Sequence, residues 1–472
     1  MFTQPHVLTF RSSRLRAELA DRRKGVVDSV AEPTTEAEGL LAKAFGSIPT
    51  ATKNCTLDVA ATISDSRTEA KGDVKTIRKY VQEVAHDGTL ANLRPREEYT
   101  LYDEAVYVCV YSIVNAKSKV STVYVWQGAS AIAPAKDQGQ TVAKRLAWEH
   151  SAQVHVVQQG QEPMGLIQAL GGILVTRRGA SETAPKQYML CGRKHIGNIA
   201  FDEVDYSVQS FCPGFVYLIS FPVTLQETKL YLWKGLSCST DEISAARLAA
   251  MDLSETGEII EVDNGAEFAS FLKIFGRGTM KLNIPKQSEL MKKKASAPEK
   301  FEAKLFKVQQ PEQKGGLFAM FTRRPSWNSS VSRSPSRDGQ EIKVEVKHIS
   351  PFTQADMEAE GIYIIDATHH LYVLIGPLFT SQQEATRNAV LGQALLFAQE
   401  YIAAVAAERQ VKQEGFVLFN GVPQDLKVLF RHWDDSKGLW GTAGLMAGSS
   451  PYSGNELKLL PLEEVVGAVC RE

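Results

Sequence analysis

The chain has 472 residues, a hydrophobic content of 44% and a formal net charge of −1. This length is enough for about two to four domains, and the near-zero charge excludes a global field that attracts nucleic acid. Six scattered cysteines without a CxxC pair indicate a reducing compartment and no structural zinc site. Neither a signal peptide nor an uninterrupted apolar stretch of about 20 residues is found. We therefore expect a soluble intracellular protein.

The N-terminal segment, residues 1–50, is basic at first and then rich in Pro, Thr and Glu. The basic part is compatible with one helix. The Pro/Thr/Glu-rich part, residues 31–39, has too few apolar residues to bury a core, so it is predicted to be a flexible tether. We expect residues 1–50 to form a basic, flexible arm.

One phrase occurs three times in the rest of the chain. Val-Tyr-Val-Trp-Gln-Gly at 123–128 returns as Leu-Tyr-Leu-Trp-Lys-Gly at 230–235 and as Leu-Tyr-Val-Leu-Ile-Gly at 371–376. Each copy predicts a buried strand that ends at glycine. A second tyrosine-bearing strand precedes each copy at a progressively shorter separation, which is typical of a hairpin whose loop shortens. The paired tyrosines are Tyr107 and Tyr124, Tyr217 and Tyr231, and Tyr363 and Tyr372.

A long helix is predicted after each glycine, at 136–148, at 240–251 and around 391–405. A buried strand and a short helix follow it, and the first of these strands contains His155, which we expect in the core. Strands covered by helices make an α+β layered domain. We therefore expect three α+β domains, each a central mixed β-sheet flanked by one long and one short α-helix.

The predicted boundaries follow from these elements and from composition. Residues 286–340 are low in apolar residues and rich in Ser, Arg and Pro, so they are predicted to be a disordered linker. Residues 437–472 are a Gly/Ser-rich tail whose short apolar end, 459–466, is a candidate for docking back. The expected domains are repeat 1 at 51–182, repeat 2 at 195–285 and repeat 3 at 341–436.

The combined order of these motifs resembles the gelsolin/villin repeat. It is clearest in repeat 2, where the Tyr-x-Trp-x-Gly strand, a helix beginning Asp-Glu and a later Gly-x-Glu-x-x-x-Phe occur in sequence. The resemblance covers about 100–285 and 355–435, and in size the chain resembles the three-repeat members of the family. The long linker and the basic arm depart from those compact forms.

The resemblance implies actin binding at filament ends or sides, with capping, severing or both. In that family the long helix of the first repeat inserts into a cleft of actin, and the second repeat grips the filament side. Helix-in-groove binding needs an exposed apolar strip flanked by charge. Each candidate residue has a competing interpretation, because one face of the same helix must also cover its own sheet. The candidates are Val142, Arg145, Leu146, Trp148, Ile243 and Arg247, of which Trp148 lies off the apolar stripe.

The resemblance also raises Ca²⁺ as a ligand, which the family holds with an acidic residue on the first strand, a helix Glu and backbone carbonyls. Here Ala105, Phe215 and Gly361 occupy the acidic position. Gly214 and Glu242 are the remnant of such a site in repeat 2, although Glu242 also suits the first turn of a helix. Since one carboxylate is a poor Ca²⁺ site, we expect no required cofactor and weak or absent calcium dependence.

Basic segments suggest a second partner, an anionic phosphoinositide surface, to which comparable segments of the family bind. Polybasic runs attract such lipids by about 1 kcal/mol per charge. A solvated linker is the alternative interpretation. The candidate residues are Arg177, Arg178, Lys292, Lys293 and Lys294. We expect a monomer that is located in the cytoplasm, on the actin cytoskeleton, and that does not bind nucleic acid.

Two other function classes compete with an actin regulator. Gelsolin-like modules also occur as structural parts of vesicle-coat proteins, so an interaction scaffold without actin activity stays open. The sequence contains no recognisable nucleotide-binding, metalloprotease or serine-hydrolase motif, which argues against an enzyme. His369 and His370 are interpreted as part of a hairpin turn and not as metal ligands.

Overall fold

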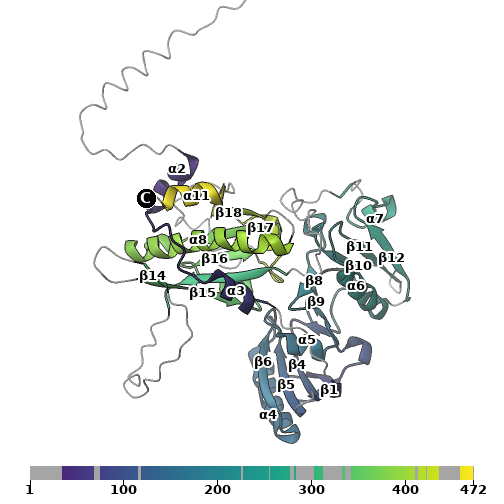
Figure 1. The fold of residues 1–472 in the computed structure, drawn as a ribbon. Helices are drawn as coiled ribbons and strands as arrows, with labels where there is room; N and C mark the ends of the chain where they lie inside the picture. The colour runs from purple at the N-terminus through teal and green to yellow at the C-terminus, as the bar shows by residue number, and fades with distance from the viewer. Residues whose placement is uncertain are drawn as a thin grey trace, which may run out of the picture.

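The structure is a computed structural model. It describes residues 35–67, 75–114, 119–224, 227–254, 256–276, 281–282, 302–311, 332–334, 342–409, 413–420, 422–434 and 458–470. Within these residues, three β-sheets and their helices form three lobes (Figure 1). Each lobe contains one copy of the repeated phrase, and we keep the names repeat 1, repeat 2 and repeat 3 for them.

The sheet of repeat 1 has the strand order β2-β1-β4-β5-β6. The central hairpin β4–β5 is antiparallel, and β6 lies parallel to β5, so the sheet is mixed as expected. Its strands are β1 (Lys75–Val84), β2 (Leu90–Asn92), β4 (Val106–Val114), β5 (Lys119–Gln127) and β6 (Gln153–Gln158).

The sheet of repeat 2 has the order β12-β11-β10-β8-β9-β7-β3. Its last two strands, β3 and β7, come from the part of the chain assigned to repeat 1, so the two repeats share a sheet. Its strands are β3 (Thr100–Tyr102), β7 (Ile173–Arg177), β8 (Tyr188–His195), β9 (Asn198–Val204), β10 (Val216–Pro222), β11 (Thr228–Lys234) and β12 (Ile259–Asp263). The sheet therefore begins before the predicted boundary at 195.

The sheet of repeat 3 has the order β14-β15-β13-β16-β17-β18-β19. Its strands are β13 (Lys304–Gln309), β14 (Ser332–Ser334), β15 (Ile342–Ile349), β16 (Ile362–Asp366), β17 (His370–Ile375), β18 (Glu414–Asn420) and β19 (Lys458–Pro461). β13 is central in this sheet although it lies within 286–340, so the prediction that this whole segment is a disordered linker was wrong. Phe306 and Val308 are buried on one face of β13, and Leu305 is buried on the other.

Each repeat has the predicted long helix and short helix. The long helices are α4 (Ala133–His150), α6 (Thr240–Leu253) and α8 (Glu384–Arg409), and the short ones are α5 (Met164–Ala169), α7 (Ala269–Lys273) and α9 (Gln424–Lys427). Short 3₁₀ turns lie at Pro95–Glu97, Val208–Ser210, Gln354–Asp356 and Phe379–Ser381. The expected α+β class and the order of elements within each unit are confirmed.

Residues 35–67 pack on repeat 3 and not on repeat 1. They form α2 (Glu36–Phe45), begun by a capping box at Thr35 and Glu38, and α3 (Val59–Asp65). Leu41 and Phe45 lie in the same core cluster as α8, and Gln393 of α8 accepts hydrogen bonds from Thr56. The tether predicted at 31–39 is therefore helical from Glu36, while residues 1–34 lie outside the described part.

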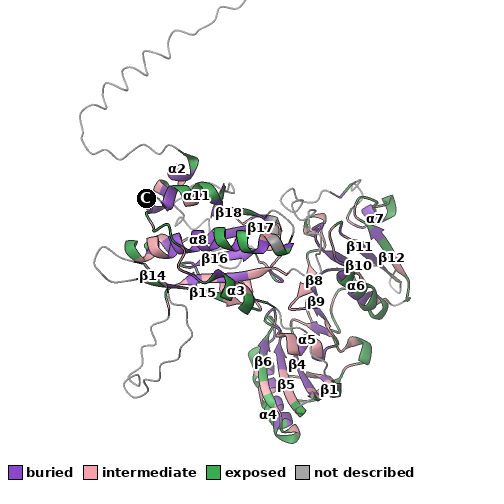
Figure 2. Cartoon of the chain, in the orientation of Figure 1, coloured by how far each residue is buried: buried purple, intermediate pink, exposed green. Residues whose placement is uncertain are grey.

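The C-terminal segment docks on repeat 3, as its apolar end indicated. β19 pairs antiparallel with β18, and α11 (Leu462–Val469) packs against α8 and α2. With sheet on one side and terminal segments on the other, α8 is buried at every position from 390 to 398 (Figure 2).

The outer strand β6 is less buried than predicted. Val157 is its buried residue, whereas His155 is exposed and packs against the ring of Tyr124 at 5.8 Å between centroids. The expectation that His155 lies in the core was wrong, because β6 is an edge strand and His155 lies on the sheet face opposite α4, where Val157 is the residue of β6 that is buried.

Among the described residues, one helix is long and apolar enough to cross a membrane by length and composition. It is the 384–406 part of α8, with a mean hydropathy of 1.4. Of the most apolar window, 61% is buried inside the protein, against sheet and terminal segments. The apolar character of α8 is thus accounted for by the core of repeat 3.

Candidate functional site

The three repeats share one backbone frame, which positions the long helices. The tyrosine of each first strand accepts a hydrogen bond from the backbone N–H five residues before it. These bonds join Tyr107 to Tyr102, Tyr217 to Cys212 and Tyr363 to Glu358. The glycine that ends each second strand lies against backbone, since a Cβ at Gly128, Gly235 or Gly376 would meet a carbonyl oxygen at 2.1–2.4 Å. The same turn therefore leads into the long helix in all three copies.

A tryptophan–glutamate hydrogen bond strengthens this frame in two repeats. The indole of Trp126 donates to Glu162 at 2.7 Å, and that of Trp233 donates to Glu267 at 2.9 Å. The same carboxylates accept the N–H of the glycine two residues earlier. The Gly-x-Glu phrase thus has a structural role, because a buried indole N–H needs a partner.

On α4 the candidate residues divide between core and surface. Val142 and Leu146 are buried against the sheet, in one cluster with Val106 and Val125. Trp148 is 85% exposed, and the exposed Arg145 lies 3.9 Å from Glu149. Of the α4 candidates, Arg145 and Trp148 therefore lie on the free face of the helix.

On α6 the structure brings an apolar and charged strip to the surface. Leu248 and Met251 are 59% and 64% exposed, next to the exposed Arg247. Ile243 is half-buried. Leu248 and Met251 were not singled out in the sequence, although Met251 lies three residues after Leu248 and four after Arg247, spacings that place side chains side by side on a helix.

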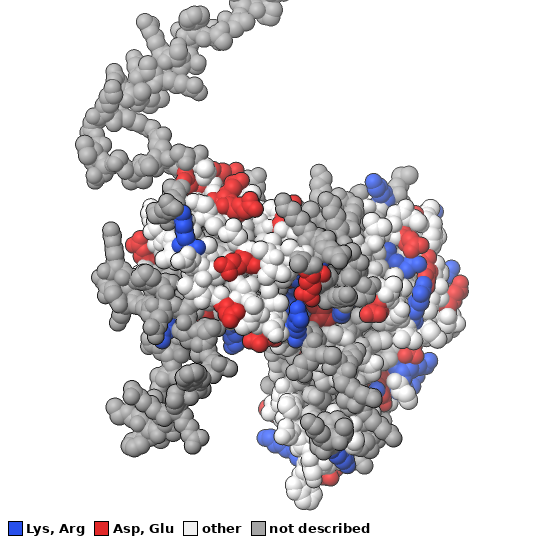
Figure 3. All heavy atoms as spheres, in the orientation of Figure 1, with Lys and Arg blue, Asp and Glu red and all other residues white. Residues whose placement is uncertain are grey.

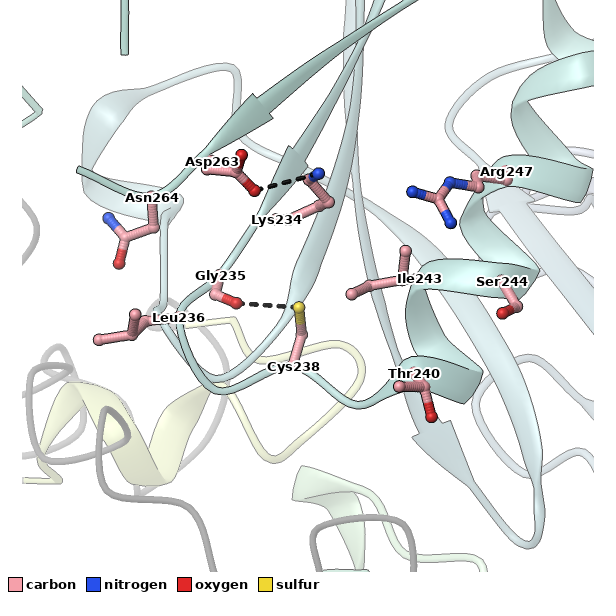
Figure 4. A pocket seen from close by; sticks show the side chains of 10 residues that line it. All are labelled: Lys234, Gly235, Leu236, Cys238, Thr240, Ile243, Ser244, Arg247, Asp263 and Asn264. Atoms are coloured by element: carbon pink, nitrogen blue, oxygen red, sulfur yellow. Dashed lines mark hydrogen bonds and ion pairs between the residues drawn. The ribbon is translucent and has the colours of Figure 1, made fainter. Parts of the chain in front are cut away.

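A pocket of about 430 Å³ opens beside the first turns of α6 (Figure 4). Its charges are largely paired: Lys234 lies 2.8 Å from Glu261 and 3.0 Å from Asp263. Hydrogen bonds from Arg247 and Lys234 lower the pKa of Glu261 to about 2. The lining residues are Lys234, Gly235, Leu236, Cys238, Thr240, Ile243, Ser244, Arg247, Asp263 and Asn264. Paired charges around apolar side chains suit a protein partner better than a small anion.

The calcium remnant in repeat 2 does not fit a Ca²⁺ ion. Glu242 is buried and accepts hydrogen bonds on both carboxylate oxygens, one from the N–H of Lys194 and the other from the N–H and hydroxyl of Ser239. Gly214 is buried in the turn before β10. The described residues contain no cluster of three or more His, Cys, Asp or Glu side chains that could hold a metal. Glu242 completes the capping box that begins α6.

The basic residues predicted to bind phosphoinositides differ in their exposure and ion pairing. Arg177 is buried, pairs with Glu203 at 2.7 Å and stacks over the ring of Tyr188. Arg178 is exposed and pairs with Asp205. Lys292, Lys293 and Lys294 lie outside the described residues. Positive and negative side chains are interspersed on the face drawn in Figure 3.

A buried ionic junction, which sequence reasoning missed, joins the three repeats. Arg431 of repeat 3 donates to Glu162 of repeat 1 and makes two hydrogen bonds with Asp202 of β9, at 3.0 and 2.8 Å. Burial alone would raise the pKa of Asp202, but the charge and hydrogen bonds of Arg431 and His432 hold it well below its usual range. The Arg431 and Glu162 positions are 269 apart in the chain, so no local pattern could have paired them.

Comparisons with known proteins agree with this architecture. The family model described as Gelsolin repeat matches residues 197–272, and gelsolin of Drosophila melanogaster is 22% identical over 367 residues. Residues 197–272 are a gelsolin repeat, and the chain is similar to gelsolin over most of its length. The match covers 77% of this gelsolin-like chain and 40% of the fly protein. Residues 80–178 match a Domain of unknown function (DUF7904), which corresponds to most of repeat 1.

Two solved structures are similar to parts of the gelsolin-like chain. They are a Thorarchaeota 2DGel3/rabbit actin complex, at 15% identity, and a Thorarchaeota ProGel/rabbit actin complex, at 25% identity. They cover 42% and 20% of this chain and all of the matched chains, each with a TM-score of 0.17.

Proposed function

We propose that this gelsolin-like protein binds actin and regulates filament ends or sides as a non-enzymatic protein. The observation that supports the proposal is the free face of α4, where Trp148 is 85% exposed beside Arg145. A large aromatic side chain held in water by a rigid helix is the type of residue that dominates binding energy at protein interfaces. The curated relative that supports the same reading is a gelsolin.

The strip on α6 supplies a second contact in this proposal. Leu248 and Met251 are exposed on the same face as Arg247, beside the pocket that Leu236 lines. Two helices from two repeats allow two contacts with neighbouring actin subunits, and linked contacts increase avidity without new interactions at either one. The proposed regulation consists of capping filament ends, severing filaments, or both.

The proposed binding does not require calcium. Both carboxylate oxygens of Glu242 are occupied by protein donors, which hold the start of α6 without a cation. We include in the proposal a monomeric protein of the cytoplasmic actin cytoskeleton. We also include phosphoinositides as a second ligand, bound by Arg178, which is exposed, and by the basic run of Lys292, Lys293 and Lys294.

Filament co-sedimentation and barbed-end elongation, each measured with Ca²⁺ and with chelator, test the proposal. We expect co-sedimentation in both conditions and slower elongation. If the protein stays in the supernatant and elongation is unchanged, the actin proposal is wrong and the scaffold interpretation takes its place.

A substitution at Trp148 locates the binding surface. Trp148→Ala should weaken filament binding by about 2–4 kcal/mol, the usual cost at a central interface aromatic. Because the side chain is exposed, the melting temperature should not change. Phe268→Ala is the matched control, since Phe268 is an exposed aromatic at the short helix of repeat 2, away from the long helices. Equal filament binding by both variants would show that α4 is not part of the actin interface.

A further inference from the structure

The strand that follows each long helix occupies the same place in all three sheets. β6, β12 and β18 each pair in parallel with the strand that ends in the repeated phrase. The register equates three residues: Val156 lies opposite Val125, Glu261 opposite Leu232, and Val417 opposite Val373. At these equivalent positions we compare what covers or protects the outer edge strand of each sheet.

In repeat 3 the outer edge is covered by the chain itself. β19 pairs with β18 antiparallel and places Leu460 opposite Val417. Val417 is fully buried, and Leu460 is 4% exposed. The edge of this sheet is therefore able to accept an extended, largely aliphatic segment.

In repeat 2 the edge is protected by charge. Glu261, the equivalent of Val417, is held by Lys234 at 2.8 Å and by Arg247 at 2.7 Å. Asp263 follows on the same strand. Charged side chains on an edge strand oppose the addition of another strand, because pairing would desolvate them.

In repeat 1 neither protection is present. The six residues of β6 contain no Lys, Arg, Asp, Glu or Pro, and Val156 is 47% exposed. In the part of the chain that the structure describes, β6 pairs with β5 on one side and with no strand on the other (Figure 1). A strand paired on one side presents a row of backbone N–H and C=O groups to an incoming chain.

We propose that β6 is a docking edge for an extended segment of a partner protein. The segment adds antiparallel to β6, with an aliphatic side chain opposite Val156, as Leu460 lies opposite Val417. Its side chains need no charge, because Gln153, His155 and Gln158 offer no carboxylate or permanent cation to pair with. Main-chain hydrogen bonds supply affinity in such strand addition, and the alternate side chains supply selectivity. The docking edge consists of the backbone of β6, whereas the actin surface proposed above consists of exposed side chains of α4.

The chain provides its own probe, a fluorescent peptide with the sequence of residues 458–469, which forms β19 and α11. In the full-length protein β18 is already covered by that segment, so we expect the peptide to add to the uncharged edge at β6. We expect saturable binding by fluorescence anisotropy, together with slower hydrogen exchange of the amides at 154–158.

Val156→Glu copies the charge that repeat 2 carries at the equivalent position and should weaken peptide binding at least tenfold. Val223→Glu is the matched control, because Val223 has the same exposed fraction of 47% and lies in repeat 2. Circular dichroism should show that both variants are folded. No saturable binding, equal binding by both variants, or protection at 416–420 in place of 154–158 would overturn the proposal.

Discussion

Glu162 and Glu267 are equivalent residues with different neighbours. Both accept the indole N–H of the repeated strand, but Glu162 also pairs with Arg431. In repeat 3 the Trp position is Leu374 and the Glu position is Pro423. The donor and the acceptor have been replaced together, so neither an indole N–H nor a carboxylate is left unpaired at this position of repeat 3.

The pH dependence of stability is predicted from His348 on β15. Burial lowers its pKa to about 4, and the charge of Lys304 adds to this effect. Because the unfolded histidine has a pKa near 6.5, its contribution to stability is fully present above about pH 6.5 and is lost as the pH falls toward 4. Thermal unfolding measured across this range should show a falling midpoint, and His348→Gln should reduce the slope.

The control for this prediction is His86→Gln, because His86 is exposed in the turn between β1 and β2. It should leave the pH profile unchanged. A profile that His348→Gln does not alter would show that other groups carry the acid sensitivity. His195, whose pKa burial holds well below its usual range, is the next such group.

At the scale of elements, the turn that ends each repeated strand depends on a close backbone approach. A Cβ at Gly235 would lie 2.4 Å from the carbonyl oxygen of Phe215 and 2.5 Å from that of Pro213. Gly235→Ala should therefore destabilise repeat 2 by about 1–3 kcal/mol, the usual cost of overpacking. Denaturant titration followed by hydrogen exchange in β10 and β11 measures the loss.

Gly39→Ala is the matched control for that substitution. Gly39 lies in α2, and a Cβ there meets nothing within 4 Å. Alanine is favoured over glycine in a helix by up to about 1 kcal/mol, so this variant should be neutral or slightly stabilised. Similar losses in both variants would mean that the strand-ending turn tolerates a side chain.

The N-terminal helices are predicted to stabilise repeat 3. α2 and α3 share a core cluster with α8, and the backbone N–H of Ala51 bonds to the carbonyl of Val469. Deletion of residues 1–67 should increase hydrogen exchange in α8 and α11 and leave β4 and β5 unchanged, because apolar surface of α8 loses its cover. Increased exchange in repeat 1 instead would place the segment where the sequence-based boundary at 51 put it.

At the scale of the whole molecule, one buried arginine joins three repeats. Arg431→Leu would leave Glu162 and Asp202 buried with their main cation removed, which typically costs about 3–5 kcal/mol. We expect repeat 3 to separate from the others before global unfolding, seen as a larger radius of gyration by small-angle X-ray scattering. Arg178→Leu is the control, since its pair with Asp205 is exposed and is worth about 0–1 kcal/mol. An unchanged radius for Arg431→Leu would show that apolar contacts alone hold the repeats together.

The amino-acid sequence alone was sufficient to predict the repeated unit, its helices and its α+β class. These depend on periodicities and turn residues within a few tens of positions, such as the strand that ends at Gly128 and the capping box at Ser239. The candidate site could be predicted only in part. Trp148 was a candidate because it lies off the apolar stripe of its helix, whereas the exposure of Leu248 and Met251 became evident only from the burial of α6.

Tertiary structure alone decided which faces are free. Val156, Glu261 and Val417 follow similar local patterns, yet one is exposed, one is ion-paired and one is covered by a strand. The covering of α8, the place of β13 in a sheet and the junction at Arg431 join residues far apart in the chain. Burial and charge pairing depend on such long-range neighbours, which a local pattern does not contain.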